Sequence, residues 1–415
     1  MVSTVTSFEI ADGIAYEAAA EGETNDDINI ADISHVIQGM QYAALAITDD
    51  KPDTLTNIGV MNPWHIEGLK MITGSEEEAH QPLTYLLKRY MQLECDEIID
   101  VSGMTKGGHF LDTQGYVAHN DEVIVLAFRC TTSIFDWLTN INTTSSEWEV
   151  EEDVAQGYSG MCSGFEGLCC NRNPKPRVHT GFYNNFLTAV PAIEKHINPL
   201  LQPDQPPRRL YVVGHSLGAG VATLAASYFL LEHDWNNLPH TLVGVTAGSP
   251  RTALGSFKNL VEEELKKKQE SATMFRIVRN KDVVATVPPR MLGFHHLGRL
   301  VFIDDKGHIK LDSDVSIHDG EDANVKQAAA KQQEAPVPNT DDDEEDGKTS
   351  KYQKSVARIP VLFRDHMPDH YLKAMRAHNK KLFPYDETEC AVCKCGEETC
   401  TKSQFLIHKK KPVEP

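Results

Sequence analysis

The chain has 415 residues, of which 60 are acidic and 40 basic, and its net charge is −20. This charge argues against a nucleic-acid-binding protein and against electrostatic attraction to anionic membranes, so contact with lipid would have to be apolar. The length suits a single large α/β domain with insertions as well as two or three smaller domains.

Helices and strands are predicted from the apolar patterns, in chain order. Two helical stripes come first, one made of Ile33, Val36, Ile37, Met40 and Ala44, the other of Leu83, Leu86, Leu87 and Tyr90. Residues 115–118 and 123–128 flank an Asn120-Asp121 turn and predict a hairpin that opens the sheet. A helix with Phe182, Phe186, Val190 and Ile193 then alternates with strands at 210–213, 242–246, 274–278 and 300–303. This alternation predicts an α/β fold.

A short amphipathic helix is predicted just after the hairpin. Its apolar residues recur at i, i+3, i+4 and i+7 and are Ile134, Trp137, Leu138 and Ile141. The stripe either faces the core or covers the entrance of a site, because both arrangements use the same spacing.

The segment Gly214-His215-Ser216-Leu217-Gly218 joins the apolar strand to a stretch of small residues at 219–227. This pattern predicts a nucleophile elbow, in which the strand reverses into a helix and holds the Ser216 hydroxyl toward a substrate. A glycine-rich connector without chemistry is the alternative. The elbow is favoured because Val221, Leu224, Ala225 and Ala226 give a helical stripe behind the serine.

A serine hydroxyl becomes a good nucleophile when an imidazole takes its proton and a carboxylate orients that imidazole. Asp282 follows the strand at 274–278, and the carboxyl end of a strand is a favourable place for a catalytic carboxylate. His366 lies further on, so that serine, aspartate and histidine occur in the order of the α/β-hydrolases. Other histidines downstream of Asp282 are alternative bases, among them His295, His296 and His370.

Several blocks of the chain resemble the class 3 lipases, the fungal-type lipase family with intracellular relatives that cleave diacylglycerol. The blocks are residues 126–133, 178–182, 214–218, 247–251, 280–289, 294–301 and 365–371, in the order of the family. The resemblance implies an α/β-hydrolase with a central, mostly parallel sheet flanked by helices and a lid insertion. It also implies that Ser216, Asp282 and His366 form the triad, because the family's catalytic histidine precedes a late tyrosine-bearing helix, here with Tyr371.

The resemblance further assigns the oxyanion hole and the lid. One oxyanion donor is the backbone N–H of Leu217, the residue after the nucleophile. Thr131 matches the second donor, with the end of a strand as its alternative role, and Cys130 replaces the family's usual glycine. Since cysteine adopts a positive φ less easily, the geometry of this loop is in doubt. The lid is assigned to residues 133–145, whose apolar stripe would meet a lipid surface on opening.

The remaining segments complete the expected organisation. The lipase domain is expected at 29–317 and 352–385, after a flexible segment at 1–28 and with an insertion at 147–175 that contains Cys162, Cys169 and Cys170. Residues 318–351 are acidic, poor in apolar residues and predicted to be a disordered loop, favoured as a solvated linker over a regulatory tail. Residues 386–415 form a Cys-rich tail with Cys390, Cys393, Cys395 and Cys400. Free or redox-active thiols are favoured there over zinc, since four ligands in so short a segment are unusual.

We therefore expect a serine hydrolase that cleaves lipid esters, foremost di- or triacylglycerol, through an acyl-enzyme and without metal or other cofactor. The expected partner is a lipid ester at a membrane or droplet surface. A cytoplasmic, peripherally attached protein is expected because we find no signal peptide and no apolar stretch of ~18 residues. The alternatives are a non-catalytic lipase-like binding or signalling protein, an esterase or phospholipase on another ester, and an acyltransferase.

Overall fold

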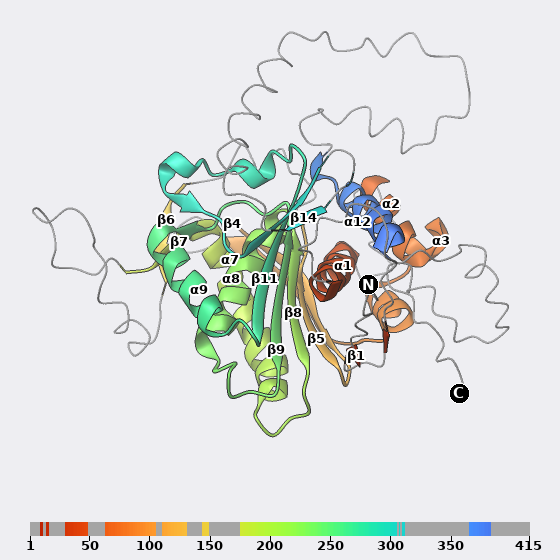
Figure 1. The fold of residues 1–415 in the computed structure, drawn as a ribbon, viewed down its shortest axis with the longest axis horizontal. Helices are drawn as coiled ribbons and strands as arrows, with labels where there is room; N and C mark the ends of the chain where they lie inside the picture. Colours follow the sequence, from red (N-terminus) through yellow and green to blue (C-terminus); the bar gives the residue numbers. More distant parts are fainter. Residues whose placement is uncertain are drawn as a thin grey trace, which may run out of the picture.

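The computed structural model describes residues 9–10, 14–15, 30–48, 63–104, 110–130, 143–148, 175–304, 307, 309–311 and 365–382. An eight-stranded sheet crosses the centre of the molecule in the order β14-β13-β11-β9-β8-β5-β4-β3 (Figure 1). Its strands are β3 (Glu94–Met104), β4 (Phe110–His119), β5 (Val123–Phe128), β8 (Arg209–His215), β9 (Thr241–Ala247), β11 (Ala272–Arg279), β13 (Arg299–Ile303) and β14 (Ile309–Leu311). Neighbours from β5 to β13 pair in parallel, and the outer strands β3, β4 and β14 pair antiparallel. The predicted α/β fold with a mostly parallel sheet is confirmed.

The predicted hairpin is formed by β4 and β5, and the Asn120 side chain accepts hydrogen bonds from the N–H groups of Glu122 and Val123 at 2.9 and 2.8 Å. The prediction that this hairpin opens the sheet is wrong, because β3 precedes it and pairs with β4. The sequence of β3 lacks the apolar pattern from which a strand is predicted. It is an edge strand with exposed apolar and charged residues, and a β-bulge between Cys95 and Glu97 breaks its alternation.

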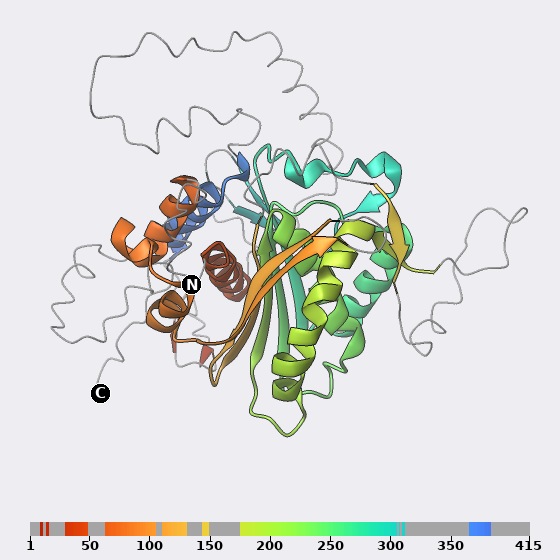
Figure 2. The same cartoon turned by 180° about the vertical axis from the view of Figure 1, so that it is seen from behind.

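Helices cover both faces of the sheet, and each face has its own apolar core (Figures 1 and 2). One face carries α1 (Ile30–Leu45), α2 (Pro63–Thr73) and α12 (Pro368–Leu382), and the other carries α7 (Thr180–Ala192), α8 (Leu217–Glu232) and α9 (Gly255–Lys267). Alternate residues of one strand face different cores: Tyr211 and Val213 of β8 face α1, whereas Leu210 and Val212 face α8. The central strands are therefore buried on both sides, which explains their continuous apolar runs.

Shorter elements complete the described chain. The second predicted stripe is divided between α4 (Leu83–Leu86) and the π-helical turn η2 (Leu87–Met91), after α3 (Glu76–Ala79). The helix α7 continues into η3 (Ile193–Ile197) and η4 (Asn198–Leu201), while η5 (Val284–Thr286) and η6 (Arg290–Leu292) follow β11. The strands β1 (Glu9–Ile10) and β2 (Ile14–Ala15) pair within the segment that was expected to be flexible.

A four-stranded sheet, in the order β12-β10-β7-β6, was not predicted from the sequence. Its strands are β6 (Ser145–Glu147), β7 (Arg177–His179), β10 (Ala253–Leu254) and β12 (Phe294–His295). Strand β6 lies across the boundary drawn between the lid and the insertion, so Ser145 belongs to a strand rather than to a lid helix.

Several predictions fall outside the described residues. They concern Thr131, the lid residues Ile134, Trp137, Leu138 and Ile141, the cysteines Cys162, Cys169 and Cys170, the acidic segment 318–351 and the Cys-rich segment 386–415. Among the residues that are described, no helix combines the length and apolarity required to cross a membrane.

Candidate active site

Ser216 occupies the sharp turn between β8 and α8, as the elbow pattern predicts. Its φ of 58° and ψ of −125° are values that residues with a side chain rarely adopt. The backbone N–H of Ser216 donates to the carbonyl of Ala247 at 3.0 Å, which fixes the turn to the end of β9. A Cβ atom on Gly218 would lie 2.4 Å from the carbonyl oxygen of Phe128, so the glycine lets α8 approach the end of β5.

His366 and Asp282 form a buried pair next to this turn. Nδ1 of His366 lies 2.9 and 2.8 Å from Oδ1 and Oδ2 of Asp282. The residues come from distant parts of the chain, since Asp282 follows β11 and His366 directly precedes α12. Because a carboxylate only accepts hydrogen bonds, Nδ1–H is the donor, and in the neutral form of this imidazole the lone pair lies on Nε2.

Two further groups hold the Asp282 carboxylate. The hydroxyl of Tyr371 donates to Oδ2 at 2.6 Å, and the backbone N–H of Val284 donates to Oδ1 at 2.9 Å. Burial, the largest influence, raises the pKa of Asp282, but the charge of His366 and these hydrogen bonds outweigh it and leave the pKa below its usual value. Asp282 is therefore ionised at neutral pH.

Tyr371 itself was not predicted as a site residue. Its hydroxyl accepts a hydrogen bond from the backbone N–H of Arg279 at 3.1 Å while it donates to Asp282. The sequence signal for this role is the position of Tyr371 in the first turns of α12, the helix that begins just after His366.

The segment that carries His366 is bonded to the loop that carries Asp282. Asp365 pairs with the guanidinium of Arg279 and accepts from the side-chain amide of Asn280 at 2.8 Å. The backbone N–H of Lys281 also donates to Asp365, at 3.3 Å. These bonds hold His366 beside Asp282, although the two residues are 84 positions apart in the sequence.

His215 and Gly248 enclose the imidazole of His366. Nε2 of His215 donates to the backbone carbonyl of His366 at 2.8 Å, and the two rings lie 4.7 Å apart. Burial and the neighbouring charge of His366 lower the pKa of His215 to about 3, so this side chain is neutral. Gly248 directly follows β9, which lies between β8 and β11, and a Cβ atom there would lie 2.7 Å from both Oδ2 of Asp282 and Cε1 of His366.

The hydroxyl Oγ of Ser216 and Nε2 of His366 are both buried, and neither has a hydrogen-bond partner within the described part of the chain. One is a proton donor at a strained elbow, and the other is the lone-pair atom of an oriented imidazole. In structures without substrate such a bond is often long or poorly aligned and tightens on binding. The arrangement can transfer a proton from a serine hydroxyl during attack on a carbonyl carbon.

The three alternative histidines lie elsewhere. His370 is on the half-exposed side of α12, with Nε2 3.8 Å from Oδ2 of Asp369. His296 donates from Nε2 to the carbonyl of Ala285 at 2.7 Å, and His295 belongs to β12 of the small sheet. His366 is the histidine of this group that contacts Asp282.

Two of the residues named for the oxyanion loop are described. Leu217 is the first residue of α8, where the N–H has no carbonyl partner within the helix. Cys130 is absent from the described non-glycine residues with positive φ, which are Gln92, Ser216 and Asn280, so the missing glycine imposes no strain at this position. Its Sγ lies 3.5 Å from Nε2 of His65, and burial raises the pKa of the thiol to about 11. No group of three or more potential metal ligands occurs in the described residues.

The fold and this site define a protein with the architecture of an α/β-hydrolase and a serine elbow beside a His-Asp pair. Residues 125–292 match the family model described as "Lipase (class 3)". Over these residues the chain is similar to the class 3 lipase family. The match contains Ser216 and Asp282, and His366 lies beyond it.

Individual relatives are similar to this chain over part of its length. Chloroplastic phospholipase A(1) DAD1 of Arabidopsis thaliana is 29% identical over 40% of this chain and 33% of its own length. Secreted mono- and diacylglycerol lipase 1 of Fusarium solani is 27% identical over 46% of this chain and 47% of its own. The chain thus spans between a third and a half of these two relatives. Among solved structures, lipase II from Rhizopus niveus aligns with a TM-score of 0.41 and 21% identity, over 66% of this chain and 82% of that one.

Proposed function

We propose that the chain is a serine hydrolase that cleaves carboxylic ester bonds of lipids, with acylglycerols as its main substrates. The observation that carries the proposal is the buried His366–Asp282 pair beside a strained Ser216, with Oγ and Nε2 both left without partners in the described chain. An unsatisfied buried polar group costs about 1–3 kcal/mol, and a catalytic role gives a reason for this cost at two atoms that exchange a proton in the proposed reaction.

The proposed mechanism uses Ser216 as the nucleophile, His366 as the base and Asp282 as the carboxylate that orients it. Oγ of Ser216 attacks the ester carbonyl carbon while Nε2 of His366 takes the hydroxyl proton, and Asp282 stabilises the resulting imidazolium. The backbone N–H of Leu217 and Thr131 hold the oxyanion, each donor contributing about 3 kcal/mol. The tetrahedral intermediate collapses, the alcohol leaves with the proton from His366, and the acyl group stays on Ser216. A water molecule, deprotonated by His366, then releases the fatty acid.

The substrate class is proposed from the names of the relatives. The Fusarium relative is named a mono- and diacylglycerol lipase, which favours acylglycerols. The Arabidopsis relative is named a phospholipase A(1), so phosphatidylcholine is the informative comparison substrate. We further propose that the reaction takes place at a lipid surface, with residues 133–145 as the lid.

The direct test is the release of fatty acid from emulsified diacylglycerol, triacylglycerol and phosphatidylcholine, and from a soluble short-chain ester. The wild-type chain is compared with Ser216→Ala and His366→Ala, and circular dichroism checks that each variant is folded. Both variants should lose activity by on the order of 10³ or more. Emulsified substrate should be cleaved faster than the soluble ester if a lid opens at the surface.

The other outcomes are equally specific. Loss in Ser216→Ala with full activity in His366→Ala would assign the base to another histidine. A folded wild-type chain that releases no acid from any ester, and whose Ser216 does not react with a fluorophosphonate, would refute the hydrolase and favour a lipase-like binding protein.

A further inference from the structure

Asp365, the residue directly before His366, is held by three donors from the turn after β11. Its Oδ1 pairs with the guanidinium of Arg279. Its Oδ2 accepts from the side-chain amide of Asn280 at 2.8 Å and from the backbone N–H of Lys281 at 3.3 Å. The side chains of Arg279 and Asp365 are only 16% and 18% exposed. Because both oxygens of the carboxylate are bonded, it cannot rotate or shift without breaking one of these bonds.

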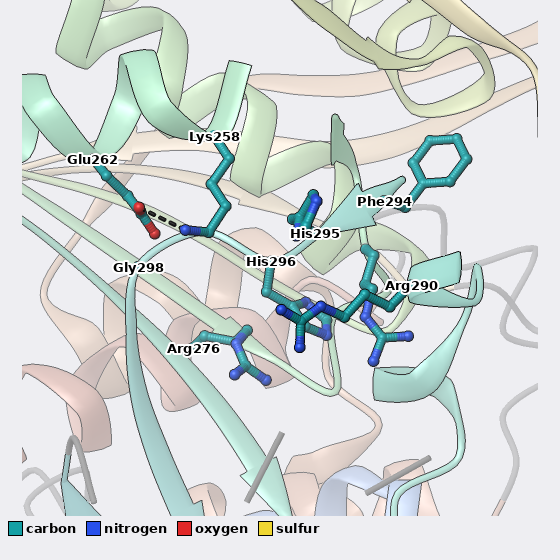
Figure 3. A pocket seen from close by; sticks show the side chains of 9 residues that line it. Lys258, Glu262, Arg276, Arg290, Phe294, His295, His296 and Gly298 are labelled. Carbon is teal, nitrogen blue, oxygen red and sulfur yellow. Dashed lines mark hydrogen bonds and ion pairs between the residues drawn. The ribbon is translucent and has the colours of Figure 1, made fainter. Parts of the chain in front are cut away.

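The turn that holds Asp365 is itself fixed by other parts of the fold. The backbone N–H of Asn280 donates to the carbonyl of Ile303 in β13 at 2.7 Å. Further along the same loop, the carbonyl of Ala285 accepts from Nε2 of His296 at 2.7 Å. His296 lies in the wall of a cavity of about 230 Å³ next to β12 (Figure 3). The loop after β11 is therefore anchored independently of Asp365.

The main chain of His366 is held on both sides. On the N-terminal side, the carboxylate of Asp365 ties the chain to the turn after β11. On the C-terminal side, the carbonyl of His366 accepts from Nε2 of His215 at 2.8 Å. The imidazole can rotate about its two side-chain torsions, but the point from which it projects is fixed between these bonds. The contact of His366 with Asp282 thus depends on the main-chain position that Asp365 and His215 define.

We propose that Asp365 is a positioning residue for the general base, which places His366 between Asp282 and Ser216 without taking part in the proton transfer. The inference rests on the proposed hydrolase function, since it requires His366 to act as the base. Catalytic groups are sensitive to placement, because a displacement of about 1 Å can cost on the order of a hundredfold in rate. A purely structural Asp365 would instead help to dock α12 and leave the turnover of the folded protein unchanged.

The first test removes the carboxylate from all three donors with Asp365→Ala. We expect kcat for a soluble short-chain ester to fall by on the order of tenfold to a hundredfold with KM nearly unchanged, because the base is displaced while the substrate site stays intact. Arg279→Gln should lower kcat in the same way. Asp365→Asn keeps an acceptor for Asn280 and Lys281, so it should recover part of the loss. Circular dichroism checks that each variant is folded.

Asp32→Ala is the matched control for a merely structural effect. The side chain of Asp32, in the first turn of α1, is 16% exposed and pairs with the guanidinium of Arg299 at 2.8 Å. It therefore resembles Asp365 in burial and in the type of its partner. Both variants lose such an ion pair and should unfold at a lower urea concentration, but Asp32→Ala should keep its kcat. Equal losses of kcat in the two variants would overturn the inference.

The decisive measurement repeats Asp365→Ala in a His366→Ala background. If Asp365 acts only through His366, its removal costs nothing more there, and the double variant keeps the residual rate of His366→Ala. A further drop as large as that in the wild-type background would overturn the inference. The rate of fluorophosphonate labelling at Ser216 is measured in parallel, since it also depends on the base but requires no lipid substrate.

The outcomes separate this inference from the proposed function. A wild-type chain that is labelled by the fluorophosphonate but cleaves no lipid ester would refute the lipid hydrolase, whereas labelling of Asp365→Ala at about a tenth of the wild-type rate or less would still support the positioning role. A wild-type chain that cleaves lipid esters, with Asp365→Ala at full kcat and full labelling rate, would refute the positioning role alone. A folded chain that is neither labelled nor active would refute both.

Discussion

At the scale of single residues, the Asp282 carboxylate is the most densely bonded group of the site, and Tyr371 is the partner whose contribution can be removed most cleanly. Tyr371→Phe deletes one hydroxyl, which donates to Oδ2 of Asp282 and accepts from the N–H of Arg279. A hydrogen bond to a charged group contributes about 1.5–3 kcal/mol, so we expect stability to fall by that amount and kcat to fall by on the order of tenfold.

Urea unfolding and esterase kinetics measure these two effects. Tyr85→Phe, at an exposed tyrosine of α4, is the matched control and should change neither. An unchanged kcat in Tyr371→Phe would mean that the remaining bonds are sufficient to hold Asp282.

Asp282 also predicts a pH dependence of stability. Its folded-state pKa lies below the usual 3.8, so the folded protein binds fewer protons there than the unfolded chain. The stabilisation is fully present above the unfolded pKa and is lost as the pH falls through the lowered pKa. We therefore expect the stability difference between the wild-type chain and Asp282→Asn, measured by urea unfolding, to be constant above about pH 5 and to shrink below about pH 4. A difference that is the same at all pH values would contradict the lowered pKa.

Gly248 has a steric role that a substitution can test. Gly248→Ala places a methyl group 2.7 Å from both members of the His366–Asp282 pair, at a φ of 57°. Displacing catalytic groups by about 1 Å can cost on the order of a hundredfold in rate, and we expect a loss of this size in kcat. Gly293→Ala has similar backbone strain at a φ of 84° but no atom within 4 Å of the new Cβ, so it should keep its activity. Equal losses in both variants would attribute the effect to strain instead of to the clash.

At the scale of elements, Trp148 joins the small sheet to the helices α7 and α9. It follows β6 and packs on Phe186 and Phe257, with ring centroids 5.7 and 4.8 Å apart. Trp148→Ala should lower the free energy of unfolding by about 3–5 kcal/mol, as for other large core truncations. Leu187→Ala, at an exposed position of α7, should change it by less than about 0.5 kcal/mol in the same urea experiment. A small effect of Trp148→Ala would mean that this sheet is only loosely attached.

The sequence predicts those helices and strands whose pattern of apolar residues is set by burial of one face, or of both faces, against a core. The strands β5, β8, β9, β11 and β13 were found because they are apolar, and the helices α1 and α7 because their stripes face a core. The strand β3 and the small sheet were missed because their pairing depends on partners far away in the chain, not on a local period. The elbow at Ser216 was predicted because its strain requires a local glycine pattern, whereas the roles of Tyr371 and Gly248 depend on the strand order.

At the scale of the whole molecule, the site is assembled from distant segments of the second half of the chain and from two layers of the fold. Ser216 and Asp282 lie at the carboxyl ends of β8 and β11, which are neighbours of β9 in the sheet. His366 arrives on the segment before α12, a helix that packs against α1 and α2 on one face (Figure 1). The correct position of the imidazole therefore depends on the docking of a helix near the end of the described chain.

Because of this dependence, we expect the active site to lose its geometry before the rest of the domain unfolds. Leu372 is a fully buried residue of α12, and Leu372→Ala should destabilise the docked helix by about 2–5 kcal/mol. The central sheet does not contain α12, so its helices and strands should persist when α12 detaches. We expect the rate of fluorophosphonate labelling at Ser216 to fall at a lower urea concentration than the circular dichroism signal in this variant. Coincident transitions would instead mean that α12 and the sheet unfold as one cooperative unit, with His366 held in place until the whole domain is lost.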